Sequence, residues 1–304
     1  MAKARAIVKR RKAVRNIRKI TKTMQMIATA KFQKSLKRAM GTKPYTRMVR
    51  DLVRELTASL GEDVQHPLLR TPDETTRTNR VALIVMTSNR GLAGAYNGHV
   101  LRAAAAFYRE QQVAGKTVDL YVAGKKGVSF LTFRKLPITH RLEAQDAPKF
   151  ADAERLANDL MTRFINGEID SVHVAYMNFV STGVQRPAVI PLLPLSSIKP
   201  EENRSEGKQP EVTPLHQEVV YDFMPEPREL LDELLPLTVK TALFQAMLDA
   251  TTSEQVMRMV AMKSATDNAD KMQKALTMQY NRARQSQITT ELSEIMGGVE
   301  AMKG

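Results

Sequence analysis

The feature that most constrains this chain is a stretch of 60 residues between Pro236 and Gly297 that contains neither glycine nor proline. As one continuous α-helix, such a stretch would be about 90 Å long at a rise of 1.5 Å per residue. Residues 2–40 at the other end of the chain also lack both residue types. Long uninterrupted helical segments at both ends of a chain favour a coiled coil over an ordinary globular packing of short helices.

Apolar periodicity supports this interpretation. Val14, Ile17, Thr21, Met24 and Ala28 follow one another at steps of 3, 4, 3 and 4 residues, which is the spacing of a coiled-coil seam. The C-terminal segment has small and apolar residues mostly three or four apart, at Leu243, Met247, Ala250, Met257, Ala261, Ser264, Asn268, Met272 and Ala275. Because most helical stability comes from packing of an apolar face, each segment needs a partner. We therefore expect an antiparallel coiled coil of the two ends.

Positive charge is concentrated in the first helical segment. The 304 residues have a formal net charge of +14. Residues 1–50 contain 17 Lys and Arg and no acidic residue, so they carry +17 and the other 254 residues carry −3. Three interpretations are open: a transit peptide, an arm that binds nucleic acid, and a helix whose solvated faces are cationic. The first serine is Ser35, which disfavours a transit peptide, because such peptides are rich in serine.

The composition excludes several classes of protein and of site. Without cysteine there is no disulfide framework, thiolate metal site or cysteine nucleophile. No run approaches the roughly 18 apolar residues of a membrane-spanning helix, so we expect membrane contact only through a partner. The histidines lack the i, i+3 or i, i+4 spacing of a metal pair, lying at His66, His99, His140, His173 and His216. We expect no catalytic residues, no metal and no cofactor.

Strand and helix patterns alternate in the middle of the chain. Four apolar runs predict buried strands at 81–87, 119–124, 172–180 and 188–193, and helical patterns occupy 99–112 and 151–164. This alternation predicts a small α/β domain with a mainly parallel sheet. The polar segment 200–214 is predicted to be an exposed loop. The second helical region is expected to start near Pro225, with a kink or break at Pro236.

Two segments resemble parts of nucleotide-binding loops. Residues 115–117 read GKT, but Glu110 stands where a phosphate-binding loop needs glycine. The turn NRGLAGAYNG at 89–98 follows a predicted strand and precedes a helix, as a dinucleotide loop does, yet two residues separate Gly91 from Gly94 where that motif has one. We interpret both segments as turns that need glycine for their backbone conformation.

Specific residues resemble the gamma subunit of F-type ATP synthase. The family's I-x-K-I-T-K-x-M-x-[ML]-[VI]-A-x-x-K pattern is similar to IRKITKTMQMIATAKFQK at 17–34. Its T-S-D-R-G-L-C-G-x-[YF]-N and G-[KR]-K-G turns are similar to TSNRGLAGAYN and VAGKKG, although Asn89 replaces the usual Asp. Its C-terminal region is similar to EQVMRMVAMKSATDNADKM at 254–272 and to YNRARQSQITTELSEI at 280–295. The similar stretches occur in the family's order along essentially the whole chain.

The resemblance implies a fold and a place in an assembly. It implies a long antiparallel coiled coil of residues 1–60 and 226–304 and a central Rossmann-like α/β domain, residues 61–225. In the family the coiled coil passes through a ring of alternating alpha and beta subunits. The α/β domain stands at its foot, beside the epsilon subunit and on the c ring of the membrane sector. The implied location is the cytoplasmic face of a bacterial inner membrane, as a peripheral subunit.

The resemblance also implies a function. The chain would be a non-catalytic rotor subunit that couples proton-driven rotation of the c ring to ATP synthesis and hydrolysis on the beta subunits and helps regulate ATPase activity. Carried over position by position, contact or coupling roles fall on Met24, Arg258, Arg284, Gln285, Thr289 and Glu291. The alternative function is a basic coiled-coil nucleic-acid-binding protein, whose binding would weaken steeply with salt and persist in residues 1–60 alone.

Overall fold

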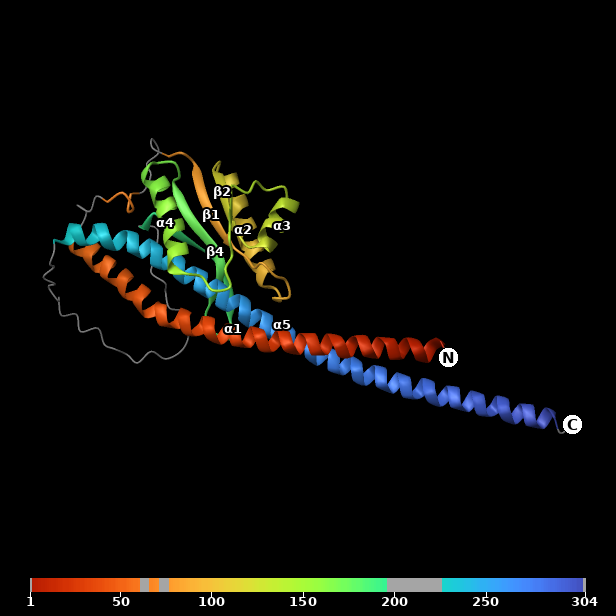
Figure 1. Cartoon of the computed structure of the whole chain (residues 1–304). Helices are drawn as coiled ribbons and strands as arrows, with labels where there is room; N and C mark the ends of the chain where they lie inside the picture. The colour runs from red at the N-terminus through yellow and green to blue at the C-terminus, as the bar shows by residue number, and fades with distance from the viewer. Residues whose placement is uncertain (1, 61–65, 71–76, 196–225, 303–304) are drawn as a thin grey trace. The chain divides into compact units, whose positions relative to one another are not determined.

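The computed structural model describes residues 2–60, 66–70, 77–195 and 226–302, so the predicted loop at 200–214 lies outside the described residues. The chain divides into two compact units. Unit 1 comprises Met1–Phe32, Leu92–Gly94 and Gln255–Gly304, and unit 2 comprises Gln33–Gly91 and Ala95–Glu254. Two long helices, α1 (Ala2–Leu60) and α5 (Pro227–Ala301), each contribute residues to both units (Figure 1). No helix in the described ranges is long and apolar enough to cross a membrane.

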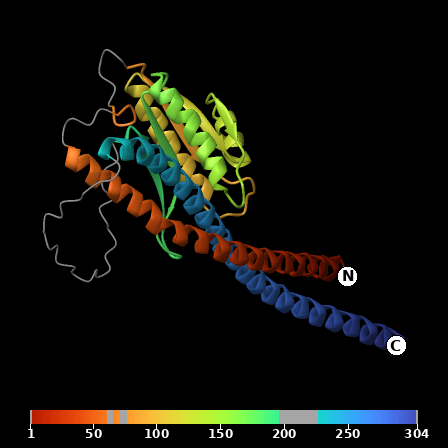
Figure 2. The same ribbon diagram turned by 60° about the vertical axis from the view of Figure 1, so that its left-hand side comes forward.

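Unit 1 is built mainly from an antiparallel pair of helices. Arg18 of α1 forms an ion pair with Asp270 of α5, and the Thr266 hydroxyl donates a hydrogen bond to Thr21 Oγ1 over 2.8 Å. The residue numbers of the partners rise along α1 as they fall along α5, and Figures 1 and 2 show the two helices side by side. The predicted antiparallel coiled coil is therefore confirmed.

The seam of this pair differs in part from the prediction. Val14, Thr21 and Ala28 are buried at intervals of seven residues and Met24 is half-buried, but Ile17 is 52% exposed. On α5 the prediction was wrong for four positions that are exposed, namely Ser264, Asn268, Met272 and Ala275, because Met262, Thr266 and Ala269 are buried there instead. Small and apolar residues occupy several sides of α5, so their spacing did not define a single face.

Unit 2 contains a five-stranded sheet with the order β3-β2-β1-β4-β5. Its strands are β1 (Arg80–Met86), β2 (Thr117–Ala123), β3 (His140–Leu142), β4 (Ser171–Phe179) and β5 (Gln185–Leu193). All neighbouring pairs are parallel except β4 and β5, which are antiparallel. The mainly parallel sheet and the four predicted strands are confirmed. The sequence analysis missed β3, because three residues are too few to show a period.

Helices cover both faces of the sheet. They are α2 (Tyr96–Val113), α3 (Lys125–Phe133), α4 (Phe150–Ile165) and the first part of α5 (Figures 1 and 2). The prediction missed α3, whose first turn contains Gly127. A kink or break was expected at Pro236, and α5 does not break there, since it begins at Pro227 and continues through Pro236. Leu235 and Val239 on either side are fully buried, and this packing holds the helix despite the missing N–H group.

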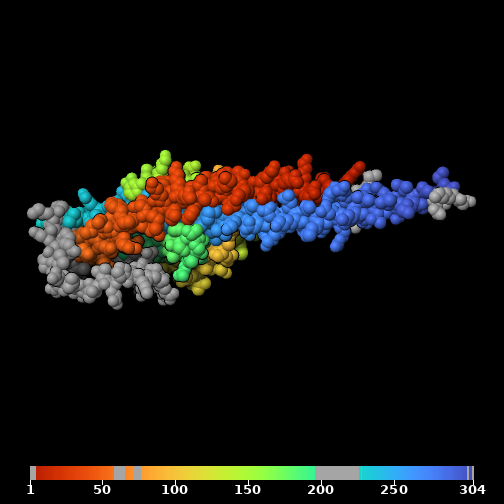
Figure 3. All heavy atoms as spheres, turned by 90° about the horizontal axis from the view of Figure 1, so that it is seen from below, coloured from red at the N-terminus to blue at the C-terminus, as the bar shows by residue number. Residues whose placement is uncertain are grey.

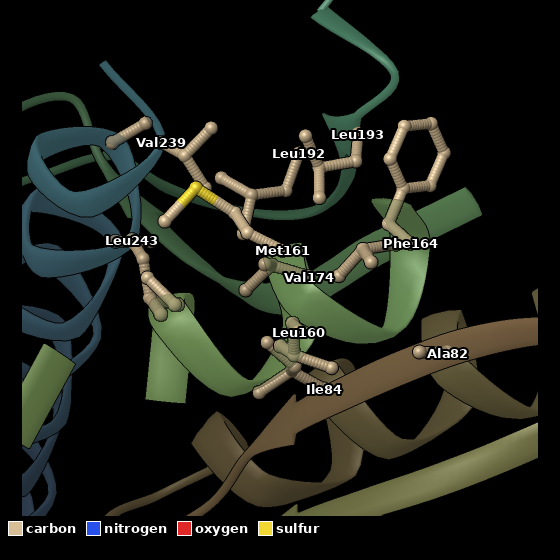
Figure 4. Packing of buried hydrophobic residues seen from close by; sticks show 14 of the residues in the cluster. Ala82, Ile84, Leu160, Met161, Phe164, Val174, Leu192, Leu193, Val239 and Leu243 are labelled. Atoms are coloured by element: carbon tan, nitrogen blue, oxygen red, sulfur yellow. The ribbon is translucent and has the colours of Figure 1, made fainter. Parts of the chain in front are cut away.

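The main hydrophobic core of unit 2 lies between the sheet and helices α4 and α5. Figure 4 shows Ile84 of β1 and Val174 of β4 facing Leu160 of α4, with Leu243 of α5 beside them. All four side chains are completely buried. Alternate residues of β1 point to this face, as expected of a strand that is covered on both sides. The core thus fixes the first part of α5 on the sheet.

Candidate coupling surface

A polar network fastens α1 to α5 inside unit 2. The Thr42 hydroxyl donates to Gln245 Oε1 over 2.8 Å, and Gln245 Nε2 donates to Asp249 Oδ1 over 3.0 Å. Lys43 Nζ lies 3.9 Å from the same carboxylate oxygen and donates to the carbonyl of Phe179 at the end of β4 over 3.2 Å. Because the side chain of Asp249 is only 5% exposed, these contacts are little screened by water. The network ties both long helices to the sheet.

Two further contacts hold α5 in unit 2. The buried Ser253 hydroxyl donates to the carbonyl of Met177 in β4 over 3.1 Å. Lys240 Nζ donates to Glu154 Oε1 of α4 over 3.0 Å. Since hydrogen bonds have narrow distance and angle requirements, these contacts fix the rotation of α5 about its own axis as well as its position.

The glycine-rich turn contributes to unit 1. Gly94 has a φ of 56°, and a Cβ atom placed on it would lie 3.6 Å from the Met257 carbonyl oxygen and 3.7 Å from the Ala261 Cβ. Gly94 therefore lies against α5 in a left-handed conformation that residues with a side chain rarely adopt. A structural role for this glycine is confirmed.

The same turn caps α3, so the first amides of that helix are already used. Gly127 N donates to Thr87 Oγ1 over 2.9 Å, and Lys125 N donates to Asn89 Oδ1 over 3.2 Å. Asn89 Nδ2 in turn donates to the carbonyl of Ala144 over 2.7 Å, which an ionised aspartate could not do. A phosphate would have to displace these side chains to reach the amides.

The GKT segment at 115–117 is also a turn. Gly115 has a φ of 75°, and Lys116 N donates to the carbonyl of Gln111 over 2.9 Å, which closes the end of α2. The segment thus ends a helix where a phosphate-binding loop would begin one.

The six residues singled out by the resemblance fall into two sets within unit 1. Met24 is half-buried, and Arg258 is 8% exposed and donates from Nη1 to Gln255 Oε1 over 3.2 Å. The other four are exposed on the last part of α5, at Arg284, Gln285, Thr289 and Glu291. The structure therefore places two residues at the helix pair and four on a helix surface that is open to solvent.

The exposed set makes contacts only along its own helix in the hydrogen bonds that the structure shows. The Thr289 hydroxyl donates to the carbonyl of Gln285 over 3.0 Å, and Gln287 Nε2 donates to Glu291 Oε1 over 2.8 Å. Such bonds keep side chains close to the helix surface. The exposed guanidinium of Arg284 presents planar donors suited to paired contact with a carboxylate.

Four apolar side chains on the same part of α5 were missed by the sequence analysis. Ile288, Leu292, Ile295 and Val299 recur at steps of 4, 3 and 4 residues and are 45–65% exposed; we call them the tip stripe. Figure 3 shows this end of α5 running on past the beginning of α1. The 3–4 spacing was the signal that could have identified them. A row of exposed apolar side chains at this spacing indicates a surface that packs against another protein.

Helix α1 also carries apolar side chains that point away from α5. Ile17, Ile20 and Ile27 are 52–59% exposed. They lie among exposed cations such as Lys19 and Lys22. This surface therefore offers both apolar and positively charged groups to a partner.

The family model described as ATP synthase matches residues 3–302. The ATP synthase gamma chain of Rhodopirellula baltica is 42% identical over 305 residues and covers 100% of both chains. The gamma chain of Leptospira biflexa is 39% identical, covering 99% of this chain and 100% of its own.

Solved structures show the same fold. The central stalk and c-ring structure of Tetrahymena thermophila mitochondrial ATP synthase contains a chain with a TM-score of 0.58, 19% identity, and coverage of 81% of this chain and 99% of that one. A chain of the Euglena gracilis mitochondrial ATP synthase OSCP, F1 and c-ring structure has a TM-score of 0.62, 17% identity, and coverage of 99% and 95%. With its antiparallel helices, mainly parallel sheet and full-length similarity, the chain belongs to the ATP synthase gamma-chain family.

Proposed function

We propose that this chain is the rotating central stalk of an F-type ATP synthase, which couples rotation of a membrane c ring to ATP synthesis and hydrolysis on beta subunits. The observation that carries the proposal is similarity to gamma chains along the whole length of the chain. The similar solved chains come from structures described as central stalk, rotor and c-ring assemblies. The nucleic-acid alternative has no support, because the relatives and structures named above are all ATP synthase chains.

The contacts of α1 and α5 suit a part that transmits torque. A shaft has to resist twisting, and two long helices packed together resist it better than one. The Thr42–Gln245–Asp249–Lys43 network and the Ser253 hydrogen bond prevent α5 from sliding or turning on the sheet of unit 2. Rotation applied to unit 2 is then passed along helices that continue into unit 1. The chain itself supplies no ATP chemistry, and its action is rigid-body allostery on the beta subunits.

Specific roles follow for the six residues that the resemblance singles out. Arg284 and Gln285 are proposed to hydrogen-bond to loops of the beta subunits, and Thr289 and Glu291 to take part in coupling beside them. Met24 and Arg258 are proposed to serve in coupling from the helix pair. The tip stripe supplies apolar contacts that allow sliding between near-equivalent packings while the shaft turns. In this proposal residues 1–60 and 226–304 form the shaft, and residues 61–225 form the foot beside epsilon and the c ring.

The proposed location is the cytoplasmic face of a bacterial inner membrane, as a peripheral subunit. Relatives from Rhodopirellula baltica and Leptospira biflexa, at 42% and 39% identity, support a bacterial setting. Attachment to the membrane would then come from the c ring, with regulation of ATPase activity through epsilon.

The experiment that tests the function is reconstitution of the chain with alpha and beta subunits and with the membrane sector. The double variant Arg284→Ala, Gln285→Ala is expected to lower proton-driven ATP synthesis by about tenfold or more, because each charge-assisted hydrogen bond contributes about 1.5–3 kcal/mol. The control is Arg282→Ala, which removes another exposed cation two residues away. Failure of the chain to co-assemble with alpha and beta subunits would refute the function, and equal activity of both variants would refute only the residue roles.

A further inference from the structure

Unit 2 contains a cavity that the rotor function does not use. It has a volume of about 460 Å³, within the range of small-molecule sites. Its lining includes Met86 at the end of β1, Ala123 at the end of β2, Leu156 of α4 and Ala250 of α5. The cavity therefore lies at the carboxyl edge of the parallel strands, where open α/β sheets bind their ligands.

Small side chains keep this space open. Ala123, Ala144 and Ala250 line the cavity between larger residues, and Ala250 is 5% exposed. Two other apolar groups in the lining, Ile84 and Met86, are almost completely buried. An apolar body entering the cavity would therefore be removed from water on several sides, which is the main source of affinity for such a group.

The charged groups of the lining are mostly acidic. Glu143, Asp152, Asp159 and Glu254 line the cavity, and Arg155 is its one basic residue. Arg155 is 81% exposed and donates to Asp152 Oδ1 over 3.3 Å, and because Glu143 and Asp159 are exposed too, water screens charges of both signs. The other oxygen of the Asp152 carboxylate, Oδ2, is buried and has no hydrogen-bond partner within the described residues. With four acidic residues and one basic residue, the lining carries a net negative charge.

Three uncharged polar side chains of the lining are already hydrogen-bonded inside the protein. The Tyr96 hydroxyl donates to the carbonyl of Met86 over 3.1 Å, and the Thr87 hydroxyl donates to the carbonyl of Ala123 over 2.6 Å. The Thr251 hydroxyl is likewise used by its own helix. The other polar groups of the lining are Gln145 and the four carboxylates, whose oxygens accept hydrogen bonds.

These observations also exclude phosphate compounds, the usual ligands of this edge. The amides at the start of α3 are capped by Thr87 and Asn89, and four carboxylates would repel an anion. The cavity lies at the edge of the sheet where α/β proteins bind nucleotides, but its charged residues are mostly acidic.

We propose that this cavity binds a small amphipathic amine, with the apolar body between α4, α5 and the sheet and the protonated nitrogen among the carboxylates. A charged nitrogen can donate up to three hydrogen bonds, and the carboxylates of the lining offer oxygen atoms that accept them. The proposal does not depend on the rotor function, because the residues that line the cavity lie in unit 2, whereas the six residues with proposed contact or coupling roles lie in unit 1.

Three probes of equal length test the proposal on the purified full chain: 4-phenylbutylamine, 4-phenylbutan-1-ol and 4-phenylbutyrate. We expect the amine to shift the NMR methyl signals of Met86 and Met247, which line the cavity, and to leave Met177 unchanged. The alcohol should bind about tenfold more weakly and the carboxylate should not bind measurably. Equal binding of amine and alcohol, or preferred binding of the carboxylate, would overturn the proposal.

Variants locate the site. Ala250→Phe fills the cavity and is expected to abolish binding of the amine. Asp159→Asn and Glu143→Gln keep the shape and are expected to weaken it several-fold each, whereas Glu110→Gln on α2, outside the cavity, should have no effect. If Ala250→Phe does not fold, Asp159→Asn and Glu143→Gln still test the proposal, since unchanged affinity for the amine in both variants contradicts it. Binding that disappears when the chain is assembled with alpha and beta subunits would show that a partner occupies the cavity and would also overturn it.

Discussion

Replacement of Gln245 by leucine tests the network that joins α1 to α5. The substitution removes three hydrogen bonds but keeps a side chain of similar size, and the longest of the three, to the Ala39 carbonyl over 3.4 Å, contributes least. The bond from the Thr42 hydroxyl, at 2.8 Å, joins uncharged groups and contributes about 1 kcal/mol. The bond to Asp249, at 3.0 Å, has a charged acceptor that is almost completely buried, and it contributes about 2–3 kcal/mol. Burial of the leucine offsets about 1 kcal/mol, which leaves an expected loss of about 2–3 kcal/mol.

The assay is urea unfolding of the full chain, followed by circular dichroism because the chain has no tryptophan. Gln279→Leu on an exposed surface of α5 is the control, with an expected change of less than about 0.5 kcal/mol. A double-mutant cycle with Thr42→Val should give a coupling energy of about 1 kcal/mol. If Gln245→Leu unfolds with the free energy of the control, or if the coupling energy is zero, the network does not hold the helices together.

Three further predictions concern other parts of the chain. Gly124→Ala should destabilise unit 2 by about 3 kcal/mol or more, because φ is 93° and the added Cβ would overlap the Thr87 carbonyl oxygen. Gly115→Ala is the control, because φ is 75° there but the added Cβ meets open space. It should lower the free energy of unfolding by about 1 kcal/mol in the same assay. Burial, with a smaller contribution from Lys116, lowers the pKa of His173 to about 4 in the folded chain, against 6.5 for a free imidazole. As the pH falls, His173 is therefore protonated in the unfolded chain before it is protonated in the folded chain. Between pH 7 and pH 4 the wild type should therefore lose about 3 kcal/mol more stability than His173→Leu, and parallel pH profiles would refute this. Neutralising four lysines of α1, namely Lys9, Lys12, Lys19 and Lys22, should weaken assembly with alpha and beta subunits and lower coupled ATP synthesis. The reason is that their exposed charges are expected to face acidic surfaces of those subunits. Unchanged assembly and ATP synthesis would contradict this.

Much of the architecture could be predicted because long helices and buried strands have strong periodic signals. The spacing of Val14, Thr21 and Ala28 identified the α1 seam, and the run at 81–87 identified the central strand. Ile17 was misplaced, since an apolar residue at seam spacing packs equally well against another subunit. On α5, small residues on several sides left the orientation of the helix undefined, and only contacts such as that between Thr21 and Thr266 determine it.

The candidate site was less predictable than the fold. The coupling residues came from resemblance, because nothing in the spacing of Arg284 or Thr289 separates them from ordinary solvated positions. The tip stripe had a readable pattern of 3–4 spacing, but the predicted seam positions ended at Ala275 and did not include it. The cavity had no sequence signal, since its lining comes from the ends of separate strands and helices that only the fold brings together.

The extension of α5 past the start of α1 has a consequence for how the chain folds and assembles. Residues 288–299, 301 and 302 are exposed and gain little from burial, so the backbone amides of this extension are expected to open at small energetic cost and exchange hydrogen with water rapidly in the isolated subunit. The helix pair around Thr21 should exchange far more slowly. On assembly, protection should rise most in the extension, so the exchange rate of this segment reports whether assembly has taken place.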